Sequence, residues 1–304
     1  MSDIQYLTQQ QIDREKWDRC VRRADNGLVY SFSFYLDHMA RHWDALVLGD
    51  YEAVMPLTWH KKYGIAYLYQ PFLAAQLGIT GNHLDAKVVE TFLHSIPSHF
   101  KYIDIYLNHQ NVFPIPGFPL YQRVNFVLNL GSSYDVLIKG YRENIRRNTK
   151  KAEQAGCTLH KDIPVTQVID LALLQMREHS DESNENAKRF EKLYTLLQSR
   201  QMAMTYGMND AKGELVASCV FFFSHNRIYY ILVGNHPNGK TLGASHALID
   251  AVIKEYAGQN FLLDFEGSDV PSLAFFYSSF GGVEEKYAGL RMNRLPFYLR
   301  WMKK

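Results

Sequence analysis

The chain has 304 residues, of which 47% are hydrophobic and 21% charged, and its formal net charge is +2. These values are typical of globular proteins and exclude a fibrous or intrinsically disordered chain. A chain of this length is expected to form two domains, each large enough to bury a core. The small net charge does not require a polyanionic partner, so the placement of the charges is more informative than their sum.

The sequence gives no sign of export or of a membrane segment. Residues 1–13 lack the basic and apolar regions of a secretory signal. The longest apolar run, CVFFF at 219–223 with its neighbours, is far shorter than the roughly 20 residues that span a bilayer. We therefore expect a cytoplasmic protein without membrane insertion. The cysteines are far apart and form no C-x-x-C pair, which favours buried, reduced thiols over disulfides or a thiolate metal site; they are Cys20, Cys157 and Cys219.

The first half of the chain alternates helical and strand patterns. A helix is expected from Thr8, a candidate N-cap, to about Ala24, and a second one at 34–42. Strands then precede one further helix, and two strands follow it. These elements are strands 44–50, 52–59 and 63–70, helix 85–96, and strands 102–107 and 123–130.

The second half has a similar order. A loop at 131–133 leads into a long helix at 134–155, which Gly156 ends. The elements expected after it are helices 166–179 and 187–200, strands 202–208, 214–223 and 227–234, helix 244–257 and strand 260–266. In both halves, antiparallel strands run into one crossover helix and a further strand. This repetition predicts a mixed α/β (α+β mixed-sheet) fold with two similar domains, 1–130 and 131–304.

A glycine-bearing loop joins the strand 227–234 to the helix that begins at Ala244. Unpaired backbone N–H groups at such a helix start suit a phosphate or pyrophosphate. Lys240, Gly243 and Ser245 are therefore candidate phosphate-binding residues. The alternative is a purely structural turn, because glycine-rich turns before helices are common.

The predicted helix 134–155 carries an unbalanced basic stripe. Six cations lie between 139 and 151 and only Glu143 opposes them; they are Lys139, Arg142, Arg146, Arg147, Lys150 and Lys151. Such a stripe suits the phosphates of coenzyme A, a nucleotide sugar or a tRNA acceptor stem, and the alternative is a solvated helix face. The preferred contacts are Arg146, Arg147 and Asn148, because guanidinium groups bind phosphate with two hydrogen bonds.

Several motifs carry a family resemblance. Lys240-x-x-Gly243-x-Ser245 resembles the R/Q-x-x-G-x-G/A signature with which GCN5-related N-acetyltransferases (GNAT) hold the pyrophosphate of coenzyme A, with Lys and Ser as departures. In that family, a short helix carries a Tyr four residues before a Gly that begins the final hairpin. Tyr277 and Gly281 have this separation, and the resemblance implies a terminal strand pair at 282–299.

A second resemblance covers the whole chain. The segments EAVMPLTWHKKYGIAYLYQPFLAAQLG, YRENIRRNTKKAEQAG and FFYSSFGG are similar to FemAB-like proteins. These are tandem duplications of the GNAT fold that transfer acyl or aminoacyl groups to amines, and their best-known members use aminoacyl-tRNA to build peptidoglycan cross-bridges. The cross-bridge enzymes have a Lys in an F-K-x-x-F-G pattern, where this sequence has Tyr277.

Acyl transfer to an amine needs a base for the amine, a site for the developing oxyanion and a proton for the leaving group. Asp264 and Glu266 alternate with apolar residues at the end of a predicted strand and are the candidate bases, unless they cap a helix or pair with a cation. Backbone N–H groups of 229–234 are the candidate oxyanion site. Tyr277 is the candidate proton donor, because a phenol pKa of roughly 10 matches a thiolate leaving group, and the alternative for Tyr277 is packing.

The resemblance implies an N-acyltransferase with an acyl-CoA thioester as donor and a small-molecule or peptide amine as acceptor. Two alternatives stay open. One is a FemX-type ligase that uses aminoacyl-tRNA and a peptidoglycan precursor. The other is a GNAT-like protein that has lost donor binding at 240–245 and only binds a ligand or partner.

Two weaker patterns are set aside. His38 and His42 have the spacing of zinc ligands on a helix, but the Glu of H-E-x-x-H and a third ligand are missing, so no metal is expected. GASHA at 243–247 lacks the last Gly of the G-x-S-x-G elbow, and no buried strand runs directly into Ser245.

Overall fold

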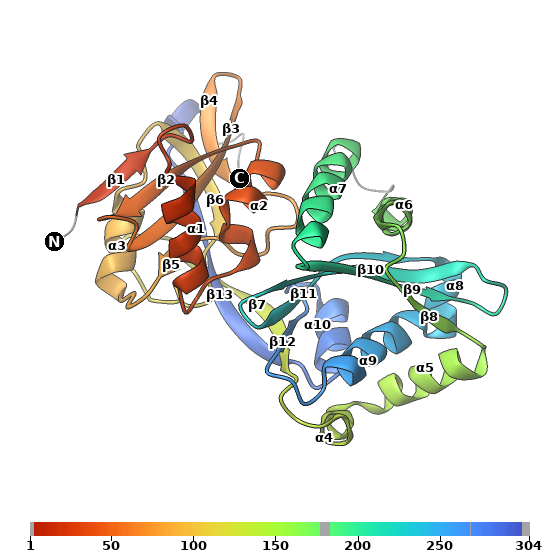
Figure 1. The fold of residues 1–304 in the computed structure, drawn as a ribbon. Coiled ribbons are helices and arrows are strands. Elements are labelled where there is room, and N and C mark those ends of the chain that lie inside the picture. Colours follow the sequence, from red (N-terminus) through yellow and green to blue (C-terminus); the bar gives the residue numbers. More distant parts are fainter. Residues whose placement is uncertain (1–2, 177–182, 268, 300–304) are drawn as a thin grey trace. The chain divides into compact units, whose positions relative to one another are not determined.

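The computed structural model describes residues 3–176, 183–267 and 269–299 (Figure 1). The chain forms two compact units, which we call unit 1 (residues up to 123 together with those from 286 on) and unit 2 (residues 124–285). The expected mixed α/β fold is confirmed by the element order and by the mixture of parallel and antiparallel strands. The prediction that 1–130 and 131–304 are two similar domains stays a prediction.

The described strands of unit 1 are mostly antiparallel, and among them only β4 and β6 pair in parallel. Its strands, in spatial order, are β1 (Ile4–Leu7), β2 (His42–Leu48), β3 (Ala53–Lys62), β4 (Ile65–Tyr69), β6 (Phe100–Tyr106) and the end of β13 (Val283–Asn293), with β5 (Thr80–Gly81) beside β3. Its helices are α1 (Arg14–Arg23), the 3-10 turn η1 (Val29–Ser31), α2 (Ser33–Met39) and α3 (Ala86–His94).

The structure corrects the predicted start of unit 1. The first helix begins only after Asp13, whose side chain accepts hydrogen bonds from the backbone N–H groups of Glu15 and Lys16, so Thr8 is not the N-cap. The preceding residues form β1, which was not predicted, because its stability comes from pairing with β2. The predicted helix 34–42 ends at Met39, and His42 already belongs to β2.

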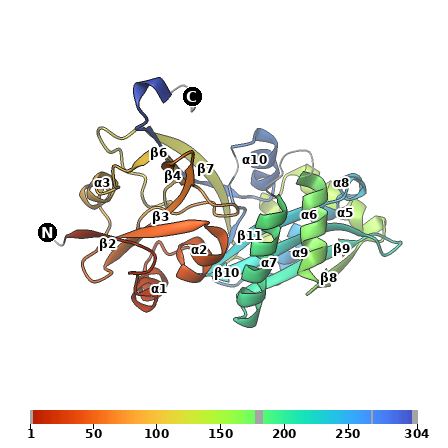
Figure 2. The same cartoon turned by 90° about the horizontal axis from the view of Figure 1, so that it is seen from above.

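The strands of unit 2 also combine parallel and antiparallel pairs. Its strands, in spatial order, are β7 (Leu120–Asn129), β12 (Leu262–Asp264), β11 (Arg227–Asn235), β10 (Leu215–Ser224), β9 (Ala203–Asn209) and β8 (Thr158–Lys161). Helices α6 (Val165–Met176) and α7 (Ser183–Ser199) cover one face, and α5 (Glu143–Gln154) and α9 (Ala244–Tyr256) lie on the other (Figure 2). Two short helices complete the unit, α8 (Pro237–Leu242) and α10 (Pro271–Ser278). The predicted end of the helix 166–179 lies outside the described residues.

The predicted long basic helix at 134–155 is wrong as a single element. It is divided into α4 (Tyr134–Leu137), the 3-10 turn η2 (Ile138–Gly140) and α5, with Tyr141 and Arg142 extended between them. The break follows from tertiary hydrogen bonds. The Tyr134 and Tyr141 hydroxyls both donate to the carboxylate of Asp250 on α9, and the Arg142 N–H donates to the Ser279 carbonyl at 2.9 Å.

The expected terminal strand pair is also wrong. Residues 283–293 form one long strand, β13, whose last part pairs with β6, and a turn follows it. The three cysteines are unpaired thiols as expected, but only Cys219 is fully buried, while Cys20 and Cys157 are partly exposed. Among the described residues, no helix is both long and apolar enough to cross a bilayer.

Candidate functional site

The centre of unit 2 has a strand pair that separates. β12 pairs with β11 only between Arg227–Tyr229 and 262–264, whereas β11 continues to Asn235 along β10. The register with β10 shifts so that Ile231 has no partner there, which is a β-bulge. Beyond Tyr229, no described strand pairs with β11 on its β12 side. This open edge contains the predicted oxyanion groups, and ligands commonly bind where parallel strands end in this way.

Tyr277 lies close to the end of β12. It is carried by α10, which was predicted as a short helix and begins with Pro271 at a position where proline suits a helix. Its ring is 8% exposed and stacks on Phe265 with ring centres 4.9 Å apart. The hydroxyl has no hydrogen-bond partner among residues 3–176, 183–267 and 269–299. Burial and the nearby charge of Glu266 raise the pKa of Tyr277, so the phenol keeps its proton at neutral pH.

Asp264 belongs to a buried ionic network. Its Oδ2 accepts a 2.6 Å hydrogen bond from Arg227, and its Oδ1 accepts one from Asn125 at 2.9 Å. Arg227 also binds Glu285 through both guanidinium ends, at 2.9 and 2.7 Å. Burial alone would lower the pKa of Arg227, but the two carboxylates outweigh it and raise that pKa. Asp264 is 2% exposed and fully engaged, which favours the predicted alternative of pairing with a cation over a role as base.

Glu266 differs from Asp264. It follows β12 in a left-handed backbone conformation with φ of 66°, and it is partly exposed. Its backbone N–H donates to Asp264 Oδ1 at 2.9 Å, so the buried network holds this unusual conformation. Burial is the main cause of the raised pKa of Tyr277, and the Glu266 charge adds to it. Of the two candidate bases, Glu266 is the one whose charge acts on the pKa of Tyr277.

The predicted phosphate loop is not an open loop. Its residues form α8, and Lys240 is exposed on that helix. Gly243 joins α8 to α9 with φ of 79°, and a Cβ there would lie 2.5 Å from the carbonyl oxygen of Asn148. The main chain of α5 therefore covers one side of the α9 start. The Ser245 hydroxyl donates to the Asn235 side chain and is already used.

The three preferred phosphate contacts on α5 have different surroundings. Arg146 and Arg147 are exposed, and Arg146 Nη2 donates to the Ile138 carbonyl at 2.8 Å. Asn148 faces α9, where its Nδ2 lies 3.3 Å from His246 Nε2. The basic stripe is thus divided between solvent and a helix contact.

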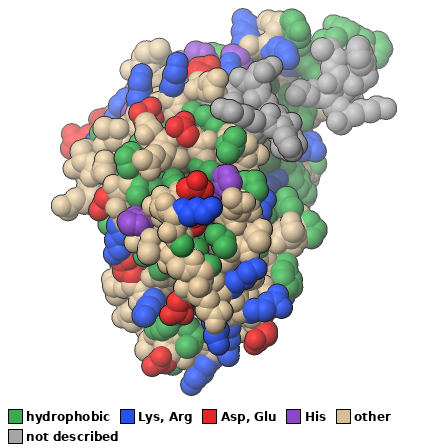
Figure 3. Space-filling model, turned by 90° about the vertical axis from the view of Figure 1, so that its right-hand side faces the viewer, with side chains coloured by type: hydrophobic (Ala, Val, Ile, Leu, Met, Phe, Trp, Pro, Cys, Tyr) green, Lys and Arg blue, Asp and Glu red, His purple; other side chains and the backbone are tan. Residues whose placement is uncertain are grey.

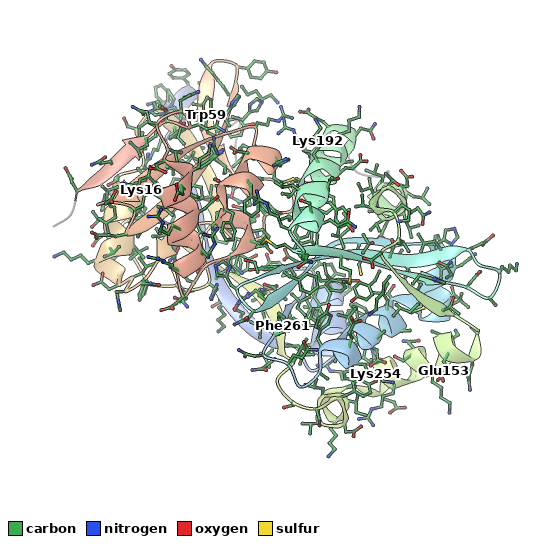
Figure 4. All side chains as sticks on the ribbon, in the orientation of Figure 1. Lys16, Trp59, Glu153, Lys192, Lys254 and Phe261 are labelled. Atoms are coloured by element: carbon green, nitrogen blue, oxygen red, sulfur yellow. The ribbon has the colours of Figure 1, made fainter. Side chains whose placement is uncertain are left out.

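The charge pattern of this region is mixed. A groove of about 480 Å³ runs beside the stripe, and its lining includes Lys139, Arg146 and Lys150 but also Asp135 and Glu153. Figure 3 shows one face of the molecule on which Lys and Arg side chains are interspersed with Asp and Glu. Figure 4 marks Glu153 on α5 and Lys254 on α9. No unbroken basic surface is formed by the described residues of this groove.

The sequence did not predict the roles of Arg227, Glu285, Asp250 and His246. Burial lowers the pKa of His246 to about 4, and its ring lies edge-on to Phe276 at 4.9 Å. His246 therefore connects Asn148 of α5 with α10, the helix of Tyr277. Of these four residues, only Arg227 stands out in the sequence, as a charge at the start of the apolar strand RIYYILVG. Its partners could not be read from the sequence, because they are up to 58 residues away.

Known proteins resemble this chain in its fold. Residues 139–270 match the family model described as an acetyltransferase (GNAT) domain. The crystal structure of FemX has a TM-score of 0.68 at 12% identity, covering 98% of this chain and 99% of that one. The structure of L-PGS from Bacillus licheniformis has a TM-score of 0.56 at 15% identity, covering 95% and 94%.

A third similar structure is the C-terminal domain of a putative lysylphosphatidylglycerol synthetase from Agrobacterium fabrum, with a TM-score of 0.55 at 10% identity, covering 95% and 94%. No curated protein matches the sequence significantly. Most of unit 2, residues 139–270, therefore matches a GNAT domain model. The chain as a whole has a fold similar to that of FemX.

Proposed function

We propose that the protein is an N-acyltransferase that moves an acyl group from an activated donor to an amine. The observation that carries this proposal is the position of Tyr277, a buried and protonated phenol beside Glu266 at the open edge of β11. A proton donor, a carboxylate and free backbone N–H groups are the parts that acyl transfer needs. The expected cytoplasmic location belongs to this proposal.

The chemistry assigns one role to each part. Glu266 accepts a proton from the acceptor amine as its nitrogen forms a bond to the acyl carbon. The N–H groups of β11 beyond Tyr229 stabilise the negative charge that develops on the acyl oxygen. Tyr277 gives its proton to the leaving atom of the donor as that bond breaks. Asp264 is a positioning residue that holds Glu266 through its backbone N–H.

A thioester donor is the first candidate. The family match to an acetyltransferase domain and the phenolic proton donor support acyl-CoA. The residues predicted for its pyrophosphate fit poorly, because Gly243 is covered by Asn148 and the Ser245 hydroxyl is bonded to Asn235. Only Lys240, Arg146 and Arg147 are exposed for a phosphate, so we derive no step through coenzyme A.

An aminoacyl ester donor is the second candidate, and the same covered loop favours it. Such a donor does not need a pyrophosphate site at the start of α9, and exposed Arg146 and Arg147 suit a nucleic-acid backbone. Two of the similar folds belong to proteins named for L-PGS or lysylphosphatidylglycerol synthesis. Tyr277, which stands in place of the Lys of F-K-x-x-F-G, favours the thioester donor.

Ligand-induced stabilisation separates the two donors. The melting temperature is measured with acyl-CoAs of several chain lengths, free coenzyme A, nucleotide sugars and charged tRNA. A specific ligand at 100 times its dissociation constant adds about 2.7 kcal/mol to the free energy of unfolding. A shift with acyl-CoA alone supports the thioester, a shift with charged tRNA alone supports the aminoacyl donor, and no shift with either contradicts both.

Replacing Tyr277 tests the proton donor. Tyr277→Phe keeps the stacking on Phe265 and removes only the hydroxyl, so we expect kcat to fall by about 10²- to 10⁴-fold while the melting temperature changes little. Tyr256→Phe is the control, since it removes a hydroxyl from the same unit on α9. Full transferase activity of folded Tyr277→Phe would return Tyr277 to a packing role.

A further inference from the structure

Unit 1 contains a groove that none of the predicted site residues line. Its volume is about 840 Å³. It lies where β2, β4 and β6 begin, where β3 ends and beside the residues that follow β1. One of its lining residues, Trp59 of β3, is labelled in Figure 4. Every lining residue belongs to unit 1, so the groove is defined within that unit alone.

Aromatic rings form a continuous belt along this groove. His42 stacks on Trp59 with ring centres 4.6 Å apart, and Trp59 lies 6.5 Å from Phe100. Phe100 lies 4.1 Å from His99, which in turn lies 6.0 Å from Tyr6. All five rings line the groove. Aromatic faces of this kind attract organic cations as well as apolar groups.

The belt ends at a buried carboxylate. Asp44 lines the groove and is only 7% exposed. It accepts hydrogen bonds from the Tyr6 hydroxyl at 2.6 Å and from the Gln9 N–H at 3.0 Å. No Lys, Arg or His of the described ranges forms an ion pair with it. A carboxylate has about four acceptor positions, so two are left for a ligand.

Aromatic rings beside a buried carboxylate favour a positively charged ligand. A buried carboxylate without a counter-ion is costly, and a cation bound beside it would offset that cost. An anion placed at the same end would be repelled. Lys61 and Lys101 also line the groove, but both are exposed, and Lys101 already donates to the Ser98 carbonyl at 2.9 Å.

We infer that this groove binds an organic ammonium ion, with its charged end on Asp44 and its carbon chain against the rings of Tyr6, His42 and Trp59. The site is distinct from the residues around Tyr277 and is assigned from unit 1 alone. The inference does not depend on the proposed transferase activity, because binding is measured without any acyl donor.

Titration of the whole protein with n-butylammonium, followed by NMR or calorimetry, tests this site. The neutral isostere 1-butanol and the anion butyrate are the matched ligands. We expect n-butylammonium to bind at least about tenfold more tightly than either. A short peptide with one lysine side chain distinguishes a peptide source of the ammonium group from a small free amine, and the tighter of the two probes identifies the source.

Variants then locate the binding. Asp44→Asn is expected to weaken n-butylammonium binding by about tenfold or more, and His42→Leu by about threefold. Lys61→Gln is expected to leave the affinity unchanged or to raise it, because it removes a like charge. Asp50→Asn makes the same change of charge as Asp44→Asn at an exposed position of unit 1 and is expected to change nothing.

Two results would overturn the inference. One is equal binding of n-butylammonium, 1-butanol and butyrate by the unmodified protein. The other is unchanged n-butylammonium affinity in His42→Leu together with weaker butyrate binding in Lys61→Gln, which would indicate an anion site. Since His42 and Lys61 are exposed, both variants should fold even if Asp44→Asn does not.

Discussion

Two carboxylates near Tyr277 are separated by one residue and have different physical surroundings. Asp264 is buried and bonded to Arg227 and Asn125. Glu266 is partly exposed, and its charge adds to burial in raising the pKa of Tyr277. The sequence pattern treats them alike, because both alternate with apolar residues. The environment of Asp264 favours a structural role, and in the proposed mechanism Glu266 is the base.

This difference predicts opposite effects of two neutral substitutions. Glu266→Gln should lower kcat by about 10²-fold or more with little change in stability. Asp264→Asn should lower the free energy of unfolding by about 2 to 4 kcal/mol, because it leaves Arg227 with one carboxylate fewer in a buried site. Steady-state kinetics and urea unfolding measure the two effects. A stable Asp264→Asn protein with no activity would reverse the assignment.

His246 should make stability depend on pH in the acid range. Burial lowers the pKa of His246 to about 4, so its imidazole stays neutral in the folded protein between pH 6.5 and 4. In the unfolded chain the same imidazole takes up a proton below about pH 6.5. The free energy of unfolding is therefore unaffected by His246 above pH 6.5 and falls by about 2 to 3 kcal/mol as the pH falls to 4.

Urea unfolding of the native protein and of His246→Phe between pH 7 and 4 measures this loss. The Phe side chain suits the aromatic contacts with Phe276 and Phe280, and it should remove most of the pH dependence. His160→Gln, at an exposed strand position, is the control and should keep the native dependence. If the free energy of unfolding of His246→Phe fell with pH as steeply as that of the native protein, His246 would not be the cause.

At the scale of elements, the junction of α8 and α9 depends on Gly243. A side chain there meets two costs, the positive φ of 79° and the close approach of the Asn148 carbonyl. Gly243→Ala should lower the free energy of unfolding by about 2 to 4 kcal/mol. Gly258→Ala isolates the first cost, since its φ is 80° and no atom lies within 4 Å, and it should lose about 1 kcal/mol. Equal losses in urea unfolding would mean that the contact with α5 is unimportant.

Most elements could be predicted from the sequence because their patterns are local. The strands at 214–223 and 227–234, the helix at 244–257 and the short helix of Tyr277 were expected near their observed bounds. The break at Tyr141 could not be predicted, because its partner Asp250 lies 109 residues away. The same holds for β1, whose partner strand begins at His42.

At the scale of the whole molecule, buried tyrosines should limit stability at high pH. Burial raises the pKa of both Tyr230 and Tyr277 above the ordinary value. Above about pH 10 the unfolded chain therefore loses phenolic protons that the folded protein keeps, and the free energy of unfolding falls. The slope should be up to about 1.4 kcal/mol per pH unit for each such tyrosine.

Denaturant unfolding between pH 8 and 11 measures this slope, and tyrosinate absorbance reports the ionisation. Tyr230→Phe should reduce the slope by one tyrosine. Tyr63→Phe should not, because the Tyr63 side chain is 82% exposed. If Tyr63→Phe and Tyr230→Phe behaved alike, burial would not be the cause.

The sequence by itself determined the mixed α/β class, the order of most elements, the resemblance to GNAT and FemAB-like proteins, and the choice of Tyr277 as candidate proton donor. These follow from local periodicity, from turn residues and from short motifs. The tertiary structure decided which carboxylate acts on the pKa of Tyr277, that residues 237–242 of the expected phosphate loop form a helix, and that unit 1 has a groove lined by Asp44. Burial, charge pairing and close backbone contacts depend on residues far apart in the chain, and only the folded protein brings these residues together.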